Sequence, residues 1–210
     1  MELITLYSEV LQKQLLEKNK NKTIKRTREE WMPFLESESH SITVYAGRGT
    51  GKTFNIVSRV LLSEHDCFVF CESNYHKREF WNELARRWDN ECLHKNKEIR
   101  IFNINDSLSE SSLYQLQGKE IIFDEFDSTK FCRYVELHRG LLNQAAHVVC
   151  VGSMYDVRRN LSAKLWFRES ELSYFIDSQL IDSDSSIEKF IPSSFSSYIN
   201  QLPPSRYEFI

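Results

Sequence analysis

The segment "AGRGTGKT" at residues 46–53 constrains the fold of this chain more than any other feature. It follows the apolar run "SITVYA" and precedes residues with helical periodicity. Glycine tolerates positive φ angles, so a glycine-rich turn lets successive N–H groups converge at the start of a helix, where they stabilise an anion. The segment matches the phosphate-binding loop template, with alanine replacing the first glycine. We therefore expect a strand, a phosphate-binding loop and a helix, in that order.

The template also predicts the ligands of the loop. Lys52 is expected to reach the β- and γ-phosphates of a nucleotide, and Thr53 is expected to offer its hydroxyl to Mg²⁺. ATP and Mg²⁺ are therefore the predicted cofactors. For the base, Tyr7, Trp31 and Phe34 could stack on adenine, although helix packing is the favoured role of each. The residues predicted to line the nucleotide are Ala46, Gly47, Arg48, Gly49, Thr50, Gly51, Lys52, Thr53 and Phe54.

A second motif, "EIIFDE" at residues 120–125, ends an apolar run in two carboxylates and has the form of a Walker B element. Asp124 is predicted to hold the Mg²⁺ shell, usually through water, and Glu125 to polarise the attacking water. The second acid favours ATP hydrolysis that drives work, because a nucleotide switch must not activate water. The alternative is that Glu125 only forms a salt bridge. A further run, "HVVCVG", ends at Ser153, which is a candidate sensor of the γ-phosphate.

Short apolar runs alternate with helical patterns along the chain, which predicts βαβ units and a mostly parallel sheet. Trp81, Leu84 and Trp88 give the second helix an apolar stripe that we assign to the core. A further helix is expected at residues 2–18, followed by a polar link, and Pro33 is expected to break or cap what begins at Glu29. Strands are predicted at 41–46, 67–71, 99–104, 120–125 and 147–153, and helices at 52–63, 75–89 and 131–144.

Composition sets outer limits on the class of protein. The 210 residues suffice for one domain with a buried core, and 41% hydrophobic and 13% aromatic residues predict that it folds. The five cysteines include no C-x-x-C pair, and three lie in apolar runs, which predicts reduced thiols and a cytoplasmic location. No apolar stretch approaches the ~20 residues that cross a bilayer, so no membrane association is expected.

The formal net charge of −3 is unevenly distributed. Seven cations and one carboxylate, Glu17, lie between residues 13 and 28, whereas the tail from Glu169 is acidic and rich in serine. This asymmetry suits a polyanionic partner, although a solvated surface is the plainer alternative. The cations are Lys13, Lys18, Lys20, Lys22, Lys25, Arg26 and Arg28.

Together, "AGRGTGKT", "SLYQLQGKEIIFDE" and "AHVVCVGSMYDVRRN" resemble the ATPase core of viral DNA-packaging motors, the large terminase subunit and its relatives in small tailed phages. Terminase loops resemble "GRGTGKT" in carrying an arginine, here Arg48. The resemblance covers about residues 40–160. It implies a three-layer P-loop NTPase of the additional-strand, RecA/terminase-like class, with a mostly parallel sheet, helices on both faces, an N-terminal helix and an irregular C-terminal tail.

The resemblance also implies partners. A single ATPase core is expected to complete its site from a neighbour in a homo-oligomeric ring, a pentamer or hexamer that could dock on a viral portal. An arginine of one subunit would then reach the γ-phosphate of the next, with candidates Arg139, Arg158 and Arg159, and Arg48 as the alternative within the same subunit. Double-stranded DNA is the expected substrate, gripped at its phosphates. Candidate contacts are Lys77, Arg78, Arg86, Arg87 and the N-terminal basic segment.

The expected organisation is an N-terminal helix and basic linker at 1–38, an ATPase core at 39–165 and a C-terminal extension at 166–210 packed on or near the core. About 50 residues after Arg159 cannot form the nuclease domain of a large terminase, so any nuclease is expected on another chain or in a missing domain. Two alternatives stay open. One is an oligomeric P-loop ATPase with a protein substrate, in remodelling or defence, and the other is a nucleotide-dependent assembly module.

Overall fold

One six-stranded sheet organises the computed structural model, which describes residues 14, 17–18, 20–47, 49–104, 114–125, 138–153 and 170–176. The strand order is β3-β2-β4-β5-β1-β6, and each neighbouring pair is parallel. Because β5 lies between β1 and β4, the sheet has the strand order expected of the additional-strand class. The strands are β1 (Ser41–Ala46), β2 (Cys67–Cys71), β3 (Ile99–Asn103), β4 (Glu120–Asp124), β5 (His147–Ser153) and β6 (Leu172–Ile176).

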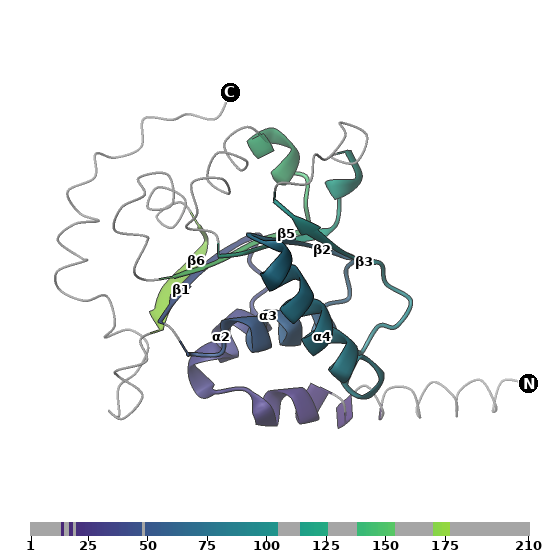
Figure 1. Cartoon of the computed structure of the whole chain (residues 1–210). Coiled ribbons are helices and arrows are strands. Elements are labelled where there is room, and N and C mark those ends of the chain that lie inside the picture. Colours follow the sequence, from purple (N-terminus) through teal and green to yellow (C-terminus); the bar gives the residue numbers. More distant parts are fainter. Residues whose placement is uncertain are drawn as a thin grey trace, which may run out of the picture.

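Helices cover both faces of the sheet (Figure 1). Helices α2, α3 and α4 lie on one face, and η2 and the helical residues 138–142 lie on the other. The predicted α/β three-layer fold is therefore confirmed. Among the described residues, no helix is both long enough and apolar enough to span a bilayer. The bounds are η1 (Glu29–Trp31), α2 (Met32–Glu36), α3 (Lys52–Leu62), α4 (Asn74–Glu91) and η2 (Tyr114–Leu116).

Two of the predictions differ from the structure, and a third falls only partly within the described residues. Strand β6, which pairs with β1, was not predicted, and it lies beyond the expected core boundary at residue 165. The predicted helix end at residue 18 is wrong, because residues 20–26 are helical. Residues 131–137 of the helix predicted at 131–144 lie outside the described residues. Within the described remainder of that range, residues 138–142 are helical. As expected, Pro33 occupies the first turn of α2, where its missing N–H costs nothing.

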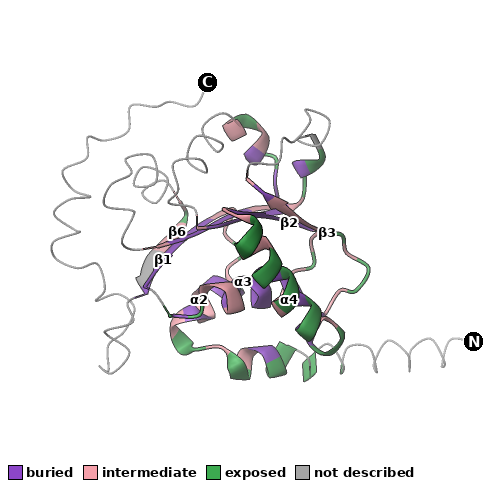
Figure 2. Cartoon of the chain, in the orientation of Figure 1, coloured by how far each residue is buried: buried purple, intermediate pink, exposed green. Residues whose placement is uncertain are grey.

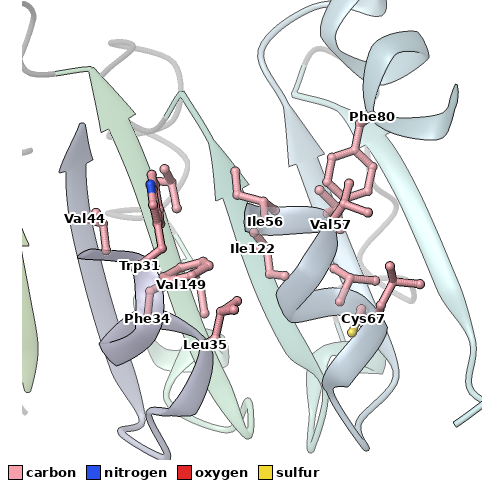
Figure 3. Close-up of a cluster of buried hydrophobic side chains, with 14 of the residues drawn as sticks. Trp31, Phe34, Leu35, Val44, Ile56, Val57, Cys67, Phe80, Ile122 and Val149 are labelled. Carbon is pink, nitrogen blue, oxygen red and sulfur yellow. The ribbon is translucent and has the colours of Figure 1, made fainter. Parts of the chain in front are cut away.

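The core lies between the sheet and the helices α2, α3 and α4 (Figure 2). Strands β2 and β4 are buried at every position, as parallel strands covered on both faces must be. Figure 3 shows Trp31 and Phe34 facing Val44 and Val149 of the sheet. The two aromatic rings meet edge to face, with centroids 5.4 Å apart. Helix packing is therefore the role of both aromatic residues.

Helix α4 corrects one prediction about the core. Leu84 is buried and Trp88 packs against the core, but the side chain of Trp81 is 56% exposed. The buried stripe contains Phe80, Leu84 and Arg87, which follow the i, i+4, i+7 spacing of a helix. Trp81 is rotated by about 100° from Phe80, because one turn takes 3.6 residues, and it therefore leaves the stripe.

A buried ion pair joins α3 to the start of β4. The Arg59 Nε lies 2.5 Å from a carboxylate oxygen of Glu120, and both side chains are almost fully buried. Arg59 also donates to the carbonyl oxygens of Phe34 and Ser37, so that one guanidinium ties α2, α3 and the sheet together. Burial raises the pKa of Glu120, but the charge of Arg59 and the hydrogen bonds from Ser63 and Arg59 together outweigh burial and hold that pKa below its ordinary value. Glu120 is therefore ionised.

Glu120→Gln is expected to destabilise the fold by about 3–5 kcal/mol, because it leaves the Arg59 charge buried without a counter-ion. Denaturant unfolding measures this loss as a lower midpoint. The matched control is Glu98→Gln, since Glu98 forms a half-exposed pair with Arg100 and its loss is expected to cost less than about 1 kcal/mol. Equal destabilisation by the two substitutions would contradict the structural role of Glu120.

Candidate active site

The phosphate-binding loop follows β1 and has the backbone conformation predicted for it. Gly49 and Gly51 have φ angles of 79° and 86°, a region that disfavours any side chain. Gly51 caps α3, whose first turn receives no hydrogen bond from a capping side chain. The N–H groups of that turn thus form the positive end of an 11-residue helix. This geometry suits a phosphate group.

Three hydrogen bonds hold the loop in place. The Thr50 hydroxyl donates to the carbonyl of Gly47 at 2.8 Å and closes the turn. The indole Nε1 of Trp31 donates to the carbonyl of Thr50 at 3.0 Å, and the Gly47 N–H donates to the carbonyl of Ile176 at 2.7 Å. Since Trp31 precedes β1 and Ile176 ends β6, two segments far apart in the sequence fix the loop from both sides.

Lys52 and Glu125 form an ion pair at the mouth of the loop. Lys52 is the first residue of α3, and Glu125 comes directly after β4. The Lys52 Nζ lies 3.2 Å from the Glu125 Oε1, with side-chain exposures of 14% and 23%. Glu125 has a φ of 63°, which is unusual for a residue with a side chain and turns the chain sharply at the end of β4. The two predicted motifs therefore meet in space.

The carboxyl ends of the central strands bring three further predicted residues to the same edge of the sheet. Ser153 ends β5 opposite Ala46 of β1, and Asp124 ends β4 opposite Val151. Asp124 is 4% exposed and Ser153 is half-buried. Ser153 thus lies on the strand between the phosphate loop and the acidic pair, which is the position expected for a sensor. Its sensing role stays a prediction.

Asp124 has a strongly shifted pKa. Burial and the neighbouring Glu125 carboxylate raise it to about 7, and the Lys52 ammonium offsets only part of that effect. The site therefore contains a carboxyl group that is poised to change its charge near neutral pH. A buried, perturbed carboxyl group beside a cation is typical of functional sites.

The shift in Asp124 predicts a pH-dependent stability. The unfolded chain ionises Asp124 near its ordinary pKa, while the folded protein retains the proton up to about pH 7, so stability attributable to this group falls as pH rises between those values. Asp124→Asn removes the group that must ionise while buried, and with it this loss of stability at high pH. In metal-free protein, the substitution is expected to raise the melting temperature by several degrees at pH 8 and by less at pH 5. A gain that is larger at pH 5 would contradict the assignment.

The donor set fits Mg²⁺. This ion usually binds through one or two protein oxygens together with substrate phosphates and water. Asp124 supplies a buried carboxylate, and the Thr53 hydroxyl lies in the first turn of α3 beside Lys52. No group of three or more His, Cys, Asp or Glu side chains able to hold a metal occurs within the described part of the chain. The residues therefore suit an ion that arrives with a phosphate group.

The arginine candidates are placed only in part. Arg48, Arg158 and Arg159 lie outside the described residues, as does Tyr7. Arg139 is half-buried in the helical residues 138–142, which lie on the face of the sheet opposite α3 (Figure 1).

Arg87 is not available for DNA, which corrects a prediction. Its side chain is buried, bonds Glu91 at 2.6 Å and donates to the Phe54 carbonyl and the Ser58 hydroxyl. Its guanidinium also lies 4.1 Å from the centre of the Phe54 ring. Phe54 is therefore held from the side of α4 as a support of the phosphate loop. Arg78 and Arg86 are exposed on α4, and Lys77 is half-buried.

Sequence reasoning missed two supports of the site, the Trp31 hydrogen bond and the buried Arg87–Glu91 pair. An arginine and a glutamate four residues apart in a helix indicate an ion pair, but this spacing is equally common on exposed faces. Trp31 carried no distinguishing signal, since an aromatic residue ahead of a buried strand is usually core.

Comparisons with known proteins leave the family open. No protein-family model matches the sequence, and no curated protein matches it either. Among solved structures, the chain is similar to the arterivirus nonstructural protein 10, a helicase, in a complex with DNA, at a TM-score of 0.45 and 19% sequence identity. The match covers 68% of this chain and 36% of that one, so the chain spans about a third of the helicase.

Proposed function

We propose that this protein is an ATP-hydrolysing motor subunit that translocates or packages double-stranded DNA as part of a homo-oligomeric ring. The observation that carries the proposal is the 3.2 Å contact between Lys52 and Glu125. It joins a helix start suited to phosphate with the strand end that bears the predicted catalytic acid.

Each residue of the site has a defined task in this proposal. The N–H groups at the start of α3 and the Lys52 ammonium bind the phosphates, and Thr53 and Asp124 hold Mg²⁺, which neutralises charge on the phosphates. Lys52 is shared between Glu125 and the phosphates, so phosphate binding weakens its ion pair. Glu125 is then free to accept a proton from water. Ser153 senses the γ-phosphate.

The proposal includes a ring of subunits and a DNA substrate. In the ring, an arginine of a neighbouring subunit would reach the γ-phosphate, with Arg48 as the alternative within the same subunit. Such an arginine contributes about 10³ to 10⁵ in rate. The exposed cations Lys18, Lys22 and Lys25 of the N-terminal helix, together with those of α4, suit the phosphate backbone of DNA.

Phosphate release from ATP, measured with and without duplex DNA of mixed sequence, tests the proposal. We expect turnover that rises when DNA is added and when protein concentration passes the threshold of assembly, which light scattering monitors in the same samples. Turnover that no nucleic acid changes would contradict the DNA motor. If a protein partner stimulated it instead, a remodelling ATPase would be the better description.

A further inference from the structure

A basic groove lies on the outer side of the helical layer, away from the sheet. It has a volume of about 1270 Å³. One wall is the N-terminal helix, whose described residues are 14, 17–18 and 20–26, and the other is the end of α4 with the loop that follows. The charged residues that line it are Lys18, Lys22, Lys25 and Lys95, with Glu17 and Asp89.

The charges in the groove favour an anionic ligand. Four ammonium groups face two carboxylates, and the contact of Lys95 with Asp89 is 3.9 Å long and exposed, so it neutralises little. Lys18, Lys22 and Lys25 are exposed and form no ion pair with any residue that the structure describes. Three asparagines in the same lining add neutral hydrogen-bonding groups.

The size of the groove favours a polymer. A site for a small ligand is usually about 300–1,000 Å³, whereas this groove is larger and open, and its lining combines lysines and asparagines with the apolar Cys92 and Leu93. Flexible ammonium groups contact successive phosphates without reading bases. These are the properties that a sequence-independent motor requires of its DNA contact.

The groove is also connected to the phosphate-binding loop. On the same N-terminal helix, the Thr23 hydroxyl and Arg26 donate to the carboxylate of Glu91 at 3.0 and 2.6 Å. Glu91 pairs with the buried Arg87, which bonds the Phe54 carbonyl one residue beyond Thr53. Four contacts thus link the helix that lines the groove to the first turn of α3.

We propose that this groove binds the phosphate backbone of nucleic acid, and that Glu91 and Arg87 couple its occupancy to the phosphate-binding loop. The inference rests on the proposed function and assigns the DNA contact to a specific surface. Because hydrogen bonds and ion pairs connect the N-terminal helix through Glu91 and Arg87 to Phe54, a shift of the helix on binding changes the position of Phe54 and of the residues beside it.

Binding of a fluorescent duplex DNA across a range of salt concentrations tests the surface. Each of Lys22→Ala and Lys25→Ala is expected to weaken binding and to lower the salt slope by about 1, since one phosphate contact is lost. Lys20→Ala is the matched control. Lys20 is exposed on the same helix but lines a different cavity, so its substitution is expected to leave the slope unchanged.

The outcomes separate the inference from the proposed function. If the parent protein binds no DNA, the DNA part of the proposed function is wrong. If it binds DNA and the Lys22 and Lys25 variants bind as tightly as the Lys20 variant, only the groove is wrong. A polyglutamate of equal charge that competes as well as DNA would show an acidic protein to be the better ligand and would overturn the assignment to nucleic acid.

Arg26 tests the connection. Arg26→Gln removes the ion pair with Glu91 and is expected to abolish most of the stimulation of ATP turnover by DNA at saturating DNA. Arg26→Lys keeps the positive charge, and this variant is expected to retain the stimulation of ATP turnover by DNA. If both variants are stimulated as strongly as the parent protein, the network does not carry the coupling. The melting temperatures of both variants, compared with that of the parent protein, test whether a loss of folding causes any loss of stimulation.

Discussion

Lys52→Ala is expected to lower ATP turnover by a factor of about 10² to 10³ or more, the usual effect of removing one charged group that stabilises the transferred phosphate. Lys52 is the first residue of α3 and lies at the mouth of the phosphate loop, paired with Glu125 at 3.2 Å. In the proposed function its ammonium neutralises charge on the γ-phosphate. Nucleotide affinity is expected to fall as well, which titration with a fluorescent ATP analogue measures.

Lys20→Ala is the control for this substitution, because Lys20 is exposed and lies on the N-terminal helix. Its turnover is expected to equal that of the parent protein. Melting temperatures establish that both variants fold. A folded Lys52→Ala variant with the turnover of the parent protein would contradict the role of this loop as the phosphate site.

Glu125→Gln is expected to lower turnover by about 10² to 10⁴, the usual contribution of a general base, while the protein still binds ATP. Glutamine has the same shape but cannot accept the proton of the attacking water. Affinity for ATP is expected to be unchanged or higher, because the substitution removes a negative charge near the phosphates and frees Lys52 from its ion pair. A binding titration and a turnover assay on one preparation measure both effects.

A variant that had lost its structure would lose both ATP binding and turnover, whereas Glu125→Gln is expected to lose turnover alone. Glu64→Gln is the matched control, since the Glu64 side chain is 76% exposed. This substitution is expected to leave both ATP affinity and turnover unchanged. If Glu125→Gln hydrolysed ATP at the rate of the parent protein, the ion pair with Lys52 would be structural, and the acid of the site would have to be sought elsewhere.

The sequence predicts most of the sheet and the meeting of the two motifs. Five strands are predicted within about one residue of their observed ends, because parallel strands buried on both faces appear as short, continuous apolar runs. The positive φ angles of Gly49 and Gly51 were also predictable, since the loop template requires glycine there. The contact between Lys52 and Glu125 follows from the strand order, which brings the ends of β1 and β4 to one edge of the sheet.

What the sequence does not predict depends on contacts between distant residues. Strand β6 is five residues long, in a serine-rich and acidic stretch, and it is stabilised by pairing with β1 rather than by its own pattern. Trp81 resembles a core residue until the observed stripe of α4 excludes it. Arg87 resembles a surface cation until Glu91 and Phe54 enclose it. Strand β6 and Arg87 depend on partners far away in the sequence, β1 and Phe54, whereas the exposure of Trp81 depends on which face of α4 is buried.

The release of phosphate from ATP by the parent protein, in Mg²⁺ and in a chelator, tests the central claim most directly. We expect release in Mg²⁺, in proportion to protein concentration above the assembly threshold, and none in the chelator. In folded protein, Lys52→Ala and Glu125→Gln are expected to lower this release by at least about 10². No release by the parent protein in Mg²⁺, with duplex DNA present and ATP bound, would contradict the assignment of residues 46–53 and 124–125 to a hydrolytic site.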